Sequence, residues 1–94
     1  MLTYKAMFKF FDGGVHAEVL DFPGAITCGQ NLEEARRLLS GALVDMAETQ
    51  WLQGKVLPMP DPNVTDSEAD LEEPIHLLLN ASSRVTLLAE VVTA

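Results

Sequence analysis

The sequence has little positive charge, a single cysteine and no long apolar run. Six Lys and Arg residues stand against fourteen Asp and Glu residues, which gives a formal net charge of −8. A chain with so few cations lacks the Lys/Arg surface that phosphate backbones require, so nucleic-acid binding is not expected. The acidic balance suits a basic partner, or it serves solubility alone.

The scarcity of cysteine and of apolar runs also bears on the compartment. The one cysteine, Cys28, cannot form a disulfide within the chain, which agrees with a reducing environment. No stretch reaches the roughly 18 consecutive apolar residues of a membrane helix. Residues 1–5 lack the basic and apolar regions of a signal peptide. The sequence therefore predicts a cytoplasmic protein with a single domain over residues 1–94.

The first part of the chain alternates between apolar and polar positions, which is the period of a half-buried strand. Residues 2–11 and 15–20 alternate and are separated by Asp12-Gly13-Gly14, a hairpin-turn signal. Asp21-Phe22-Pro23-Gly24 marks a second turn, and a short strand follows over residues 25–28. The pattern predicts an antiparallel three-stranded meander.

A long amphipathic helix is predicted over about residues 32–52, because apolar residues recur there at steps of three and four. Asn31 is suited to cap its start, with Glu34 three residues later as in a capping box. Gly54 fits the position just past the helix end, and Pro58 prevents continuation.

Two positions within this helix carry further expectations. Trp51 widens the apolar stripe, and core packing is favoured for it over a ligand pocket. Gly41 lies mid-helix, where glycine is unfavourable by about 1 kcal/mol against alanine. We therefore expect the helix backbone to approach the sheet closely at Gly41.

The last third of the chain changes in composition. Residues 61–74 are rich in proline and acid and contain no Lys or Arg, which predicts an exposed connection. A C-terminal strand or hairpin over residues 75–92 is preferred, and a helix over residues 84–92 is the alternative. The predicted fold class is α+β: a three-stranded meander packed by one long helix, with one or two C-terminal strands. The core spans residues 2–60.

The residue types of catalytic sites do not gather in this sequence. Residues 2–11 hold no carboxylate, whereas two-metal hydrolysis needs several carboxylates around Mg²⁺. His16 and His76 are the only histidines, and structural or exposed roles are favoured for both. Cys28 has no neighbouring basic activator, so a packed role is favoured over a nucleophile. We expect no enzyme activity, no metal and no cofactor.

Four short motifs follow one another at tight spacing in the first two thirds of the chain. They are Asp21-Phe22-Pro23-Gly24, Gly29-Gln30-Asn31-Leu32-Glu33-Glu34-Ala35, Gly54 and Pro58-Met59-Pro60. In order and spacing they resemble the HicB-like antitoxin family, whose pattern is an lPG turn, G-x-[ST]-x-E-E-A and G-x-x-[IL]-P-x-P. The match covers about residues 3–62. Asn31 replaces the usual Thr or Ser and caps a helix at least as well.

The resemblance implies a β-β-β-α-β domain like a partial ribonuclease H fold. Such antitoxins bind and cover a small basic toxin, HicA, which looks like a double-stranded-RNA-binding domain and cleaves RNA with a histidine. Many members also carry a C-terminal DNA-binding domain that represses their operon. Here the residues after Pro60 are acidic and Arg84 is their only basic residue, so no DNA-binding domain is expected.

The sequence thus predicts a non-enzymatic module that neutralises a HicA-type toxin. A stand-alone regulatory or scaffold domain that forms homo-oligomers is the alternative, and a metal-dependent hydrolase is the third hypothesis. The residues predicted to contact the toxin are Asp21, Phe22, Asp61, Asp66, Glu68 and Asp70. The acidic run over residues 61–73 is either a toxin-binding arm or a solvated linker.

A homodimer interface is predicted on the outward face of the first strand. Its residues are Lys5, Met7, Lys9 and Phe11. Exposed apolar groups on a sheet face favour pairing with another chain. The alternative is that another part of the same chain, such as residues 84–92, covers this face.

Overall fold

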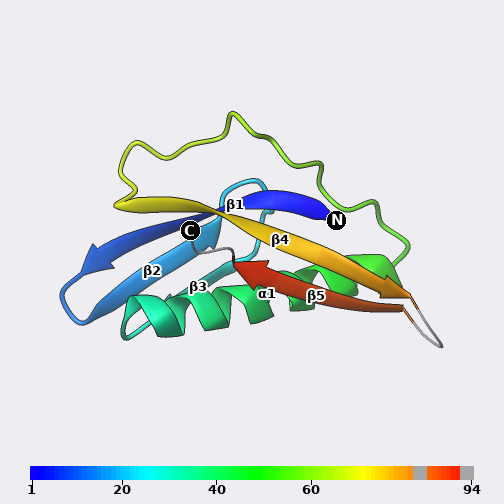
Figure 1. Ribbon diagram of the computed structural model, residues 1–94, viewed down its shortest axis with the longest axis horizontal. Helices are drawn as coiled ribbons and strands as arrows, with labels where there is room; N and C mark the ends of the chain where they lie inside the picture. The colour runs from blue at the N-terminus through cyan, green and yellow to red at the C-terminus, as the bar shows by residue number, and fades with distance from the viewer. Residues whose placement is uncertain (82–84, 92–94) are drawn as a thin grey trace.

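The structure is a computed structural model that describes residues 1–81 and 85–91, with side chains through residue 78. Its elements are β1 (Leu2–Phe11), β2 (Gly14–Val19), β3 (Ile26–Gly29), α1 (Leu32–Leu52), β4 (Leu71–Ala81) and β5 (Val85–Val91). The strands form one antiparallel sheet in the order β3-β2-β1-β4-β5, and α1 lies across one face of it (Figure 1). The predicted α+β class is confirmed, and the C-terminal part is a hairpin of two strands.

The meander forms where glycine permits its turns. Gly13 in the β1–β2 turn has a φ of 90°, and Gly24 in the β2–β3 turn has a φ of 95°, a region that other residues rarely adopt. Across β1 and β2, Lys9 lies opposite His16. Successive side chains alternate between the face covered by α1 and the opposite face, which we call the outer face.

The hydrophobic core lies between α1 and the sheet. The helix buries a stripe with a period of four residues, formed by Ala35, Leu39, Leu43 and Ala47. The buried residues that face it are Tyr4, Ala6, Phe8, Val15, Ala17, Val19, Phe22, Ala25, Ile75 and Leu77. The rings of Tyr4 and Phe22 meet edge to face with centroids 5.2 Å apart, an arrangement that the charge distribution of aromatic rings favours. Within residues 1–81 and 85–91, no helix has both the length and the apolar character needed to cross a bilayer.

The start of α1 is fixed by side-chain caps and by a close contact with β3. Asn31 Oδ1 accepts a hydrogen bond from the backbone N–H of Glu34 at 2.8 Å, and Glu34 accepts one from the N–H of Gln30 at 3.0 Å. Two backbone donors thereby gain partners. A Cβ at Gly29 would lie only 2.6 Å from the nitrogen of Ala35, so the strand and the first helical turn touch through their backbones.

β4 begins at Leu71, whereas the sequence predicts that this strand begins at residue 75. Its first residues pair with β1, with Leu71 opposite Phe8 and Pro74 opposite Lys5. Proline cannot donate to a sheet ladder; among the described residues, pairing with β5 starts at Ile75, and the neighbour of Pro74 is Lys5 on β1. The sequence does not predict this part of the strand, because acidic residues and proline are both uncommon in strands.

Three packing expectations are wrong. Trp51 continues the period of the buried stripe, but it lies in the last turn of α1 and is 47% exposed. Gly41 points away from the sheet, and a Cβ there would meet nothing within 4 Å. Cys28 is exposed, because the alternation of β3 buries Gly29 and turns its neighbour to the outer face.

Because Gly41 is helical and open to solvent, Gly41→Ala should raise the free energy of unfolding by about 1 kcal/mol. Gly54→Ala is the matched control, since that position is equally open but has a φ of 71°, where alanine is unfavourable by about 1 kcal/mol or more. Urea denaturation measures both changes. A loss of stability in Gly41→Ala would contradict the outward placement.

Candidate functional site: a strap across the outer face of the sheet

Residues 55–70 connect the end of α1 to the start of β4 and cross the outer face of the sheet, on the side away from the helix (Figure 1). We call this segment the strap. It contains no helix or strand, yet it is not a loose linker. Charged groups on β1 and carboxylates on and beside the strap fasten it to the sheet.

Two lysine side chains on the outer face of β1 contact the strap. Lys5 Nζ donates to the backbone carbonyl of Val64 at 2.6 Å and lies 3.7 Å from Glu72 on β4. Lys9 Nζ lies 3.1 Å from Asp66 and 3.3 Å from Glu68. The hydrogen bond to Asp66 is the main cause of a raised Lys9 pKa. Both lysines therefore place their charge under the strap.

Carboxylates also bind the strap's own backbone. Glu72 accepts from the Thr65 hydroxyl at 2.8 Å and from the Asp66 N–H at 2.8 Å. Asp66 in turn accepts from the Glu68 N–H at 2.9 Å. These backbone hydrogen bonds are the leading cause of the lowered pKa of Glu72 and of Asp66. The acids are thus used to shape a turn.

Asp21 joins three segments through its two carboxylate oxygens. Oδ1 accepts from the backbone N–H of Lys5 at 2.8 Å, and Oδ2 accepts from the N–H of Asp61 at 2.9 Å. The β2–β3 turn is thereby tied to the central strand and to the beginning of the strap. The position of the turn is reinforced by a bond from the Leu20 N–H to the Lys5 carbonyl at 2.9 Å.

The two ends of the strap are fixed by hydrogen bonds to β1, through a side chain of β1 at the first end and through its backbone at the other. At the first end, the Tyr4 hydroxyl donates to the carbonyl of Pro58 at 2.7 Å. Burial raises the pKa of Tyr4 to about 12, with a smaller contribution from the charge of Asp21. At the other end, Asp70 N–H donates to the Phe8 carbonyl at 2.9 Å, and Asp70 Oδ2 accepts from the Phe10 N–H at 2.7 Å. Asp70 thus extends the β1–β4 ladder.

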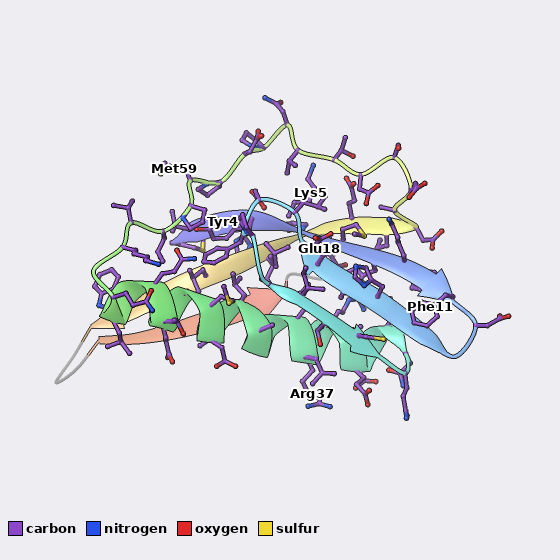
Figure 2. All side chains as sticks on the ribbon, turned by 180° about the vertical axis from the view of Figure 1, so that it is seen from behind. Tyr4, Lys5, Phe11, Glu18, Arg37 and Met59 are labelled. Carbon is purple, nitrogen blue, oxygen red and sulfur yellow. The ribbon has the colours of Figure 1, made fainter. Side chains whose placement is uncertain are left out.

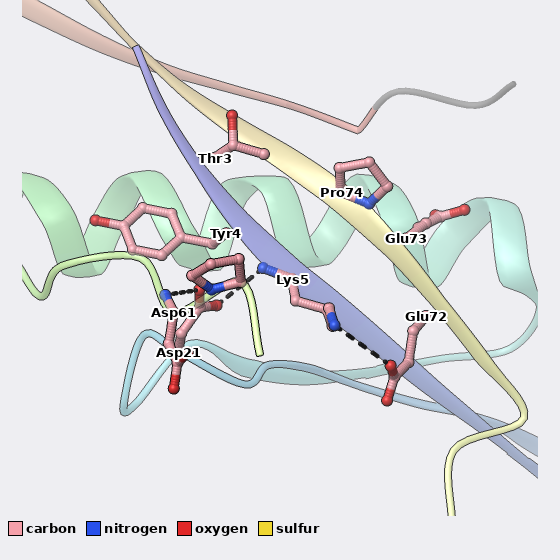
Figure 3. Close-up of a pocket in the computed structure, with 9 residues that line it drawn as sticks. Thr3, Tyr4, Lys5, Asp21, Asp61, Glu72, Glu73 and Pro74 are labelled. Atoms are coloured by element: carbon pink, nitrogen blue, oxygen red, sulfur yellow. Dashed lines mark hydrogen bonds and ion pairs between the residues drawn. The ribbon is translucent and has the colours of Figure 1, made fainter. Parts of the chain in front are cut away.

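A hollow of about 450 Å³ opens between the strap and the sheet (Figure 3). Its lining residues are Thr3, Tyr4, Lys5, Asp21, Asp61, Pro62, Glu72, Glu73 and Pro74. Its carboxylates take part in internal contacts; Glu73, for example, forms a two-bonded pair with Arg36 at 2.8 and 3.0 Å, which raises the pKa of the guanidinium. Among the described residues, no group of three or more His, Cys, Asp and Glu side chains is placed to hold a metal ion.

The structure corrects the premise of the predicted dimer surface. Met7 is only 1% exposed, so it cannot offer an apolar contact to another chain. Lys5 and Lys9, on either side of it along the outer face, both contact the strap. The alternative, cover by another part of the same chain, agrees with the structure: the strap crosses this face (Figure 1), whereas β5 (Val85–Val91) is a strand of the sheet beside β4. Of the four residues predicted for this surface, only Phe11 lies at the end of the β1–β2 hairpin, where it is about half exposed (Figure 2).

The residues predicted to contact a toxin fall into three groups. Phe22 is fully buried against Tyr4, because the β2–β3 turn folds it into the core, so its predicted surface role is wrong. Asp21, Asp66 and Asp70 each fasten a different part of the strap. Asp61 and Glu68 are exposed on the strap, and their contact with a toxin stays a prediction.

Sequence reasoning missed two features of this region. Glu72 organises the strap, but nothing marks it among the neighbouring acids unless β4 is known to begin at Leu71 and to place Glu72 opposite Met7. The exposure of Trp51 at the end of α1 was also missed, because its position continues the period of the buried stripe.

Removing the Asp21 carboxylate should destabilise the fold, because two backbone donors lose their acceptor. We expect Asp21→Ala to lower the free energy of unfolding by about 2 kcal/mol, and Asp21→Asn by about half of that because one oxygen remains. Glu48→Ala, at an exposed helical position, is the control and should stay within about 0.5 kcal/mol. Chemical denaturation measures the free energy of unfolding of all three variants. Equal losses for Asp21→Ala and the control would show that the Asp21 hydrogen bonds do not stabilise the fold.

The fastening of the strap should depend on pH on the acid side. Asp66 and Glu72 have pKa values below their ordinary 3.8 and 4.5, so their stabilising contribution is present above those values and is lost as the pH falls through the lowered ones. The amide NMR signal of Asp66, which donates to Glu72, should titrate with a midpoint below 4.5, and that of Glu68, which donates to Asp66, should titrate with a midpoint below 3.8. The Leu20 amide, which donates to a carbonyl, is the control. Midpoints at or above the ordinary values would contradict the hydrogen bonds.

Comparison with known proteins adds no relative to this geometry. The chain matches no protein-family profile, no curated protein and no solved structure.

Proposed function

We propose that this chain is an antitoxin-like module that binds and neutralises a small basic, RNA-cleaving toxin of the HicA type without catalysing a reaction itself. Two things support the proposal: the motifs that resemble the HicB-like family, and a fold of three strands, a helix and further strands that agrees with what the resemblance implies. Because such a toxin acts on cellular RNA, the proposed compartment is the cytoplasm.

The observation that carries the proposal is the internal pairing of the protein's positive charges. Lys5, Lys9 and Arg36 each form an ion pair with a carboxylate of the same chain. The chain has only six Lys and Arg residues against fourteen acids. The charge that remains for a partner is therefore predominantly negative, which attracts a basic protein and steers its approach.

The strap offers the acids best placed for such a partner. Asp61 and Glu68 lie exposed on it, on the side of the sheet away from α1. Lys9 pairs with both Asp66 and Glu68, but the Asp66 side chain is only 25% exposed, whereas that of Glu68 is 81% exposed and stays accessible to a partner. We propose that the strap presents a fixed acidic ridge to the RNA-binding surface of the toxin.

A stand-alone domain that forms homo-oligomers without a toxin is the second candidate. The exposed apolar side chains at the end of α1 favour it, because they fit a contact between copies better than a contact with a basic protein. A gene for a small basic protein beside this one favours the first candidate, and its absence favours the second.

The two candidates are separated by a neutralisation assay. The full chain is co-expressed with the small basic protein encoded beside it, and growth is followed together with RNA cleavage by the purified toxin. The proposal expects growth to be restored and cleavage to stop at a stoichiometric ratio. Cleavage that continues in the presence of excess chain would overturn it.

Association with the toxin should weaken as salt rises and should respond to charge on the strap more than to charge elsewhere. We expect the double variant Asp61→Asn/Glu68→Gln to slow association about fivefold at low salt. Asn at position 61 keeps the oxygen that accepts from the Asn63 N–H. Stopped-flow or biosensor kinetics over a salt series measure the rates.

The matched control is Asp45→Asn/Glu48→Gln, which removes the same charge from the outward side of α1. It should slow association by less than about twofold, through net charge alone. Equal effects of the two double variants would show that the strap is not the contact surface. A rate that does not change with salt would remove the electrostatic basis of the proposal.

A further inference from the structure

Four large apolar side chains lie exposed within residues 51–59, where α1 ends and the strap begins. Trp51 is 47% exposed, Leu52 85%, Val56 89% and Met59 77%. We call them the end patch; Met59 is visible on the strap in Figure 2. Their exposed area is on the order of 500 Å², which is the size of the largest apolar patches on monomeric proteins, and such patches are often functional.

The end patch is held on a fixed backbone. Gly54, with a φ of 71°, ends the helix in a turn in which its N–H donates to the Trp51 carbonyl at 3.1 Å and the Lys55 N–H donates to the Gln50 carbonyl at 2.9 Å. Leu57 packs against the core, and the Tyr4 hydroxyl holds the Pro58 carbonyl. The flanking apolar side chains are therefore kept in solvent by a rigid segment.

Charge indicates what can cover this patch. Residues 49–60 contain no Asp or Glu and a single Lys55, in a chain that carries fourteen acids. A basic partner gains no electrostatic attraction there, because the segment offers it no carboxylate. A second copy of this chain can approach at this place without opposing carboxylates, although the net charge of −8 makes two copies repel elsewhere.

The size of the patch also fits contact between copies. A standard protein interface buries about 800 Å² on each partner and has an apolar centre with a polar rim. The end patch supplies that centre, and Gln50, Gln53 and Lys55 lie exposed or half-buried within the same segment. Tryptophan and methionine are enriched at interfaces, and a domain of this size gains stability from association.

We propose that the end patch is the interface of a homodimer, in which the patch of one copy packs against the same patch of a second copy about a twofold axis. Each residue of a twofold interface is used twice, so a single substitution acts on both sides of the contact. The dimer does not require a toxin, so the proposal is tested on the chain alone and stands or falls apart from the proposed function.

The test uses sedimentation equilibrium together with the fluorescence of Trp51, the only tryptophan in the chain. The wild type should sediment as a dimer, and dilution should shift Trp51 emission to longer wavelength over the same concentration range as the fall in mass. Val56→Glu, at a position 89% exposed in the single chain, should raise the dimer dissociation constant about 100-fold or more. Met59→Glu, in the extended strap, provides a second variant with the same expected direction.

Phe11→Glu is the matched control, because Phe11 is 52% exposed and belongs to the interface that the sequence predicts. It should leave both the mass and the emission shift unchanged. A wild type that is monomeric at high micromolar concentration would overturn the proposal. So would a dimer that Phe11→Glu dissociates and that Val56→Glu and Met59→Glu leave intact.

Discussion

The architecture depends on the polar contacts that the central strand, β1, makes on its outer side. Two of its lysine side chains bind the strap, and one of its backbone N–H groups binds a carboxylate. β1 has α1 on one face, and on the other Lys5 and Lys9 reach up to a segment of opposite charge. Asp21 binds the N–H of Lys5 and that of Asp61, so the same strand position also fixes the start of the strap. A two-layer sandwich thus gains a third, polar layer without a second hydrophobic core.

This arrangement changes the meaning of the acidic composition. Single exposed ion pairs contribute little to stability, but here the carboxylates also accept hydrogen bonds from the backbone, which gives the strap a defined course. Glu72 illustrates the point, because it binds a hydroxyl, an amide and an ammonium group at once. An acidic run that composition presents as a solvated linker is therefore a surface of fixed shape, with only part of its charge left for a partner.

Much of the fold follows from local signals in the sequence. Alternation and glycine turns give the meander, and the cap at Asn31 gives the start of α1 at the predicted residue. The signals fail where a distant partner decides the outcome. Leu71 joins a strand because β1 offers a free edge, and Met7 is buried because the strap crosses over it. Phe22 and Trp51 exchange the expected roles of surface and core, because the β2–β3 turn folds Phe22 against Tyr4, whereas Trp51 lies in the last turn of α1.

The pairing of β1 has a consequence for the order in which the chain assembles. β1 meets β2 across a tight turn, whereas its other edge waits for β4, with Phe8 opposite Leu71 and Leu2 opposite Leu77. Contacts between residues so far apart in sequence form late, because closing a long loop precedes any gain from it. On the ribosome, the meander and α1 emerge first and leave one side of a hydrophobic strand without its neighbour until the C-terminal hairpin follows. During that interval the nascent chain exposes an unpaired strand edge, the feature by which partly folded β proteins most readily aggregate.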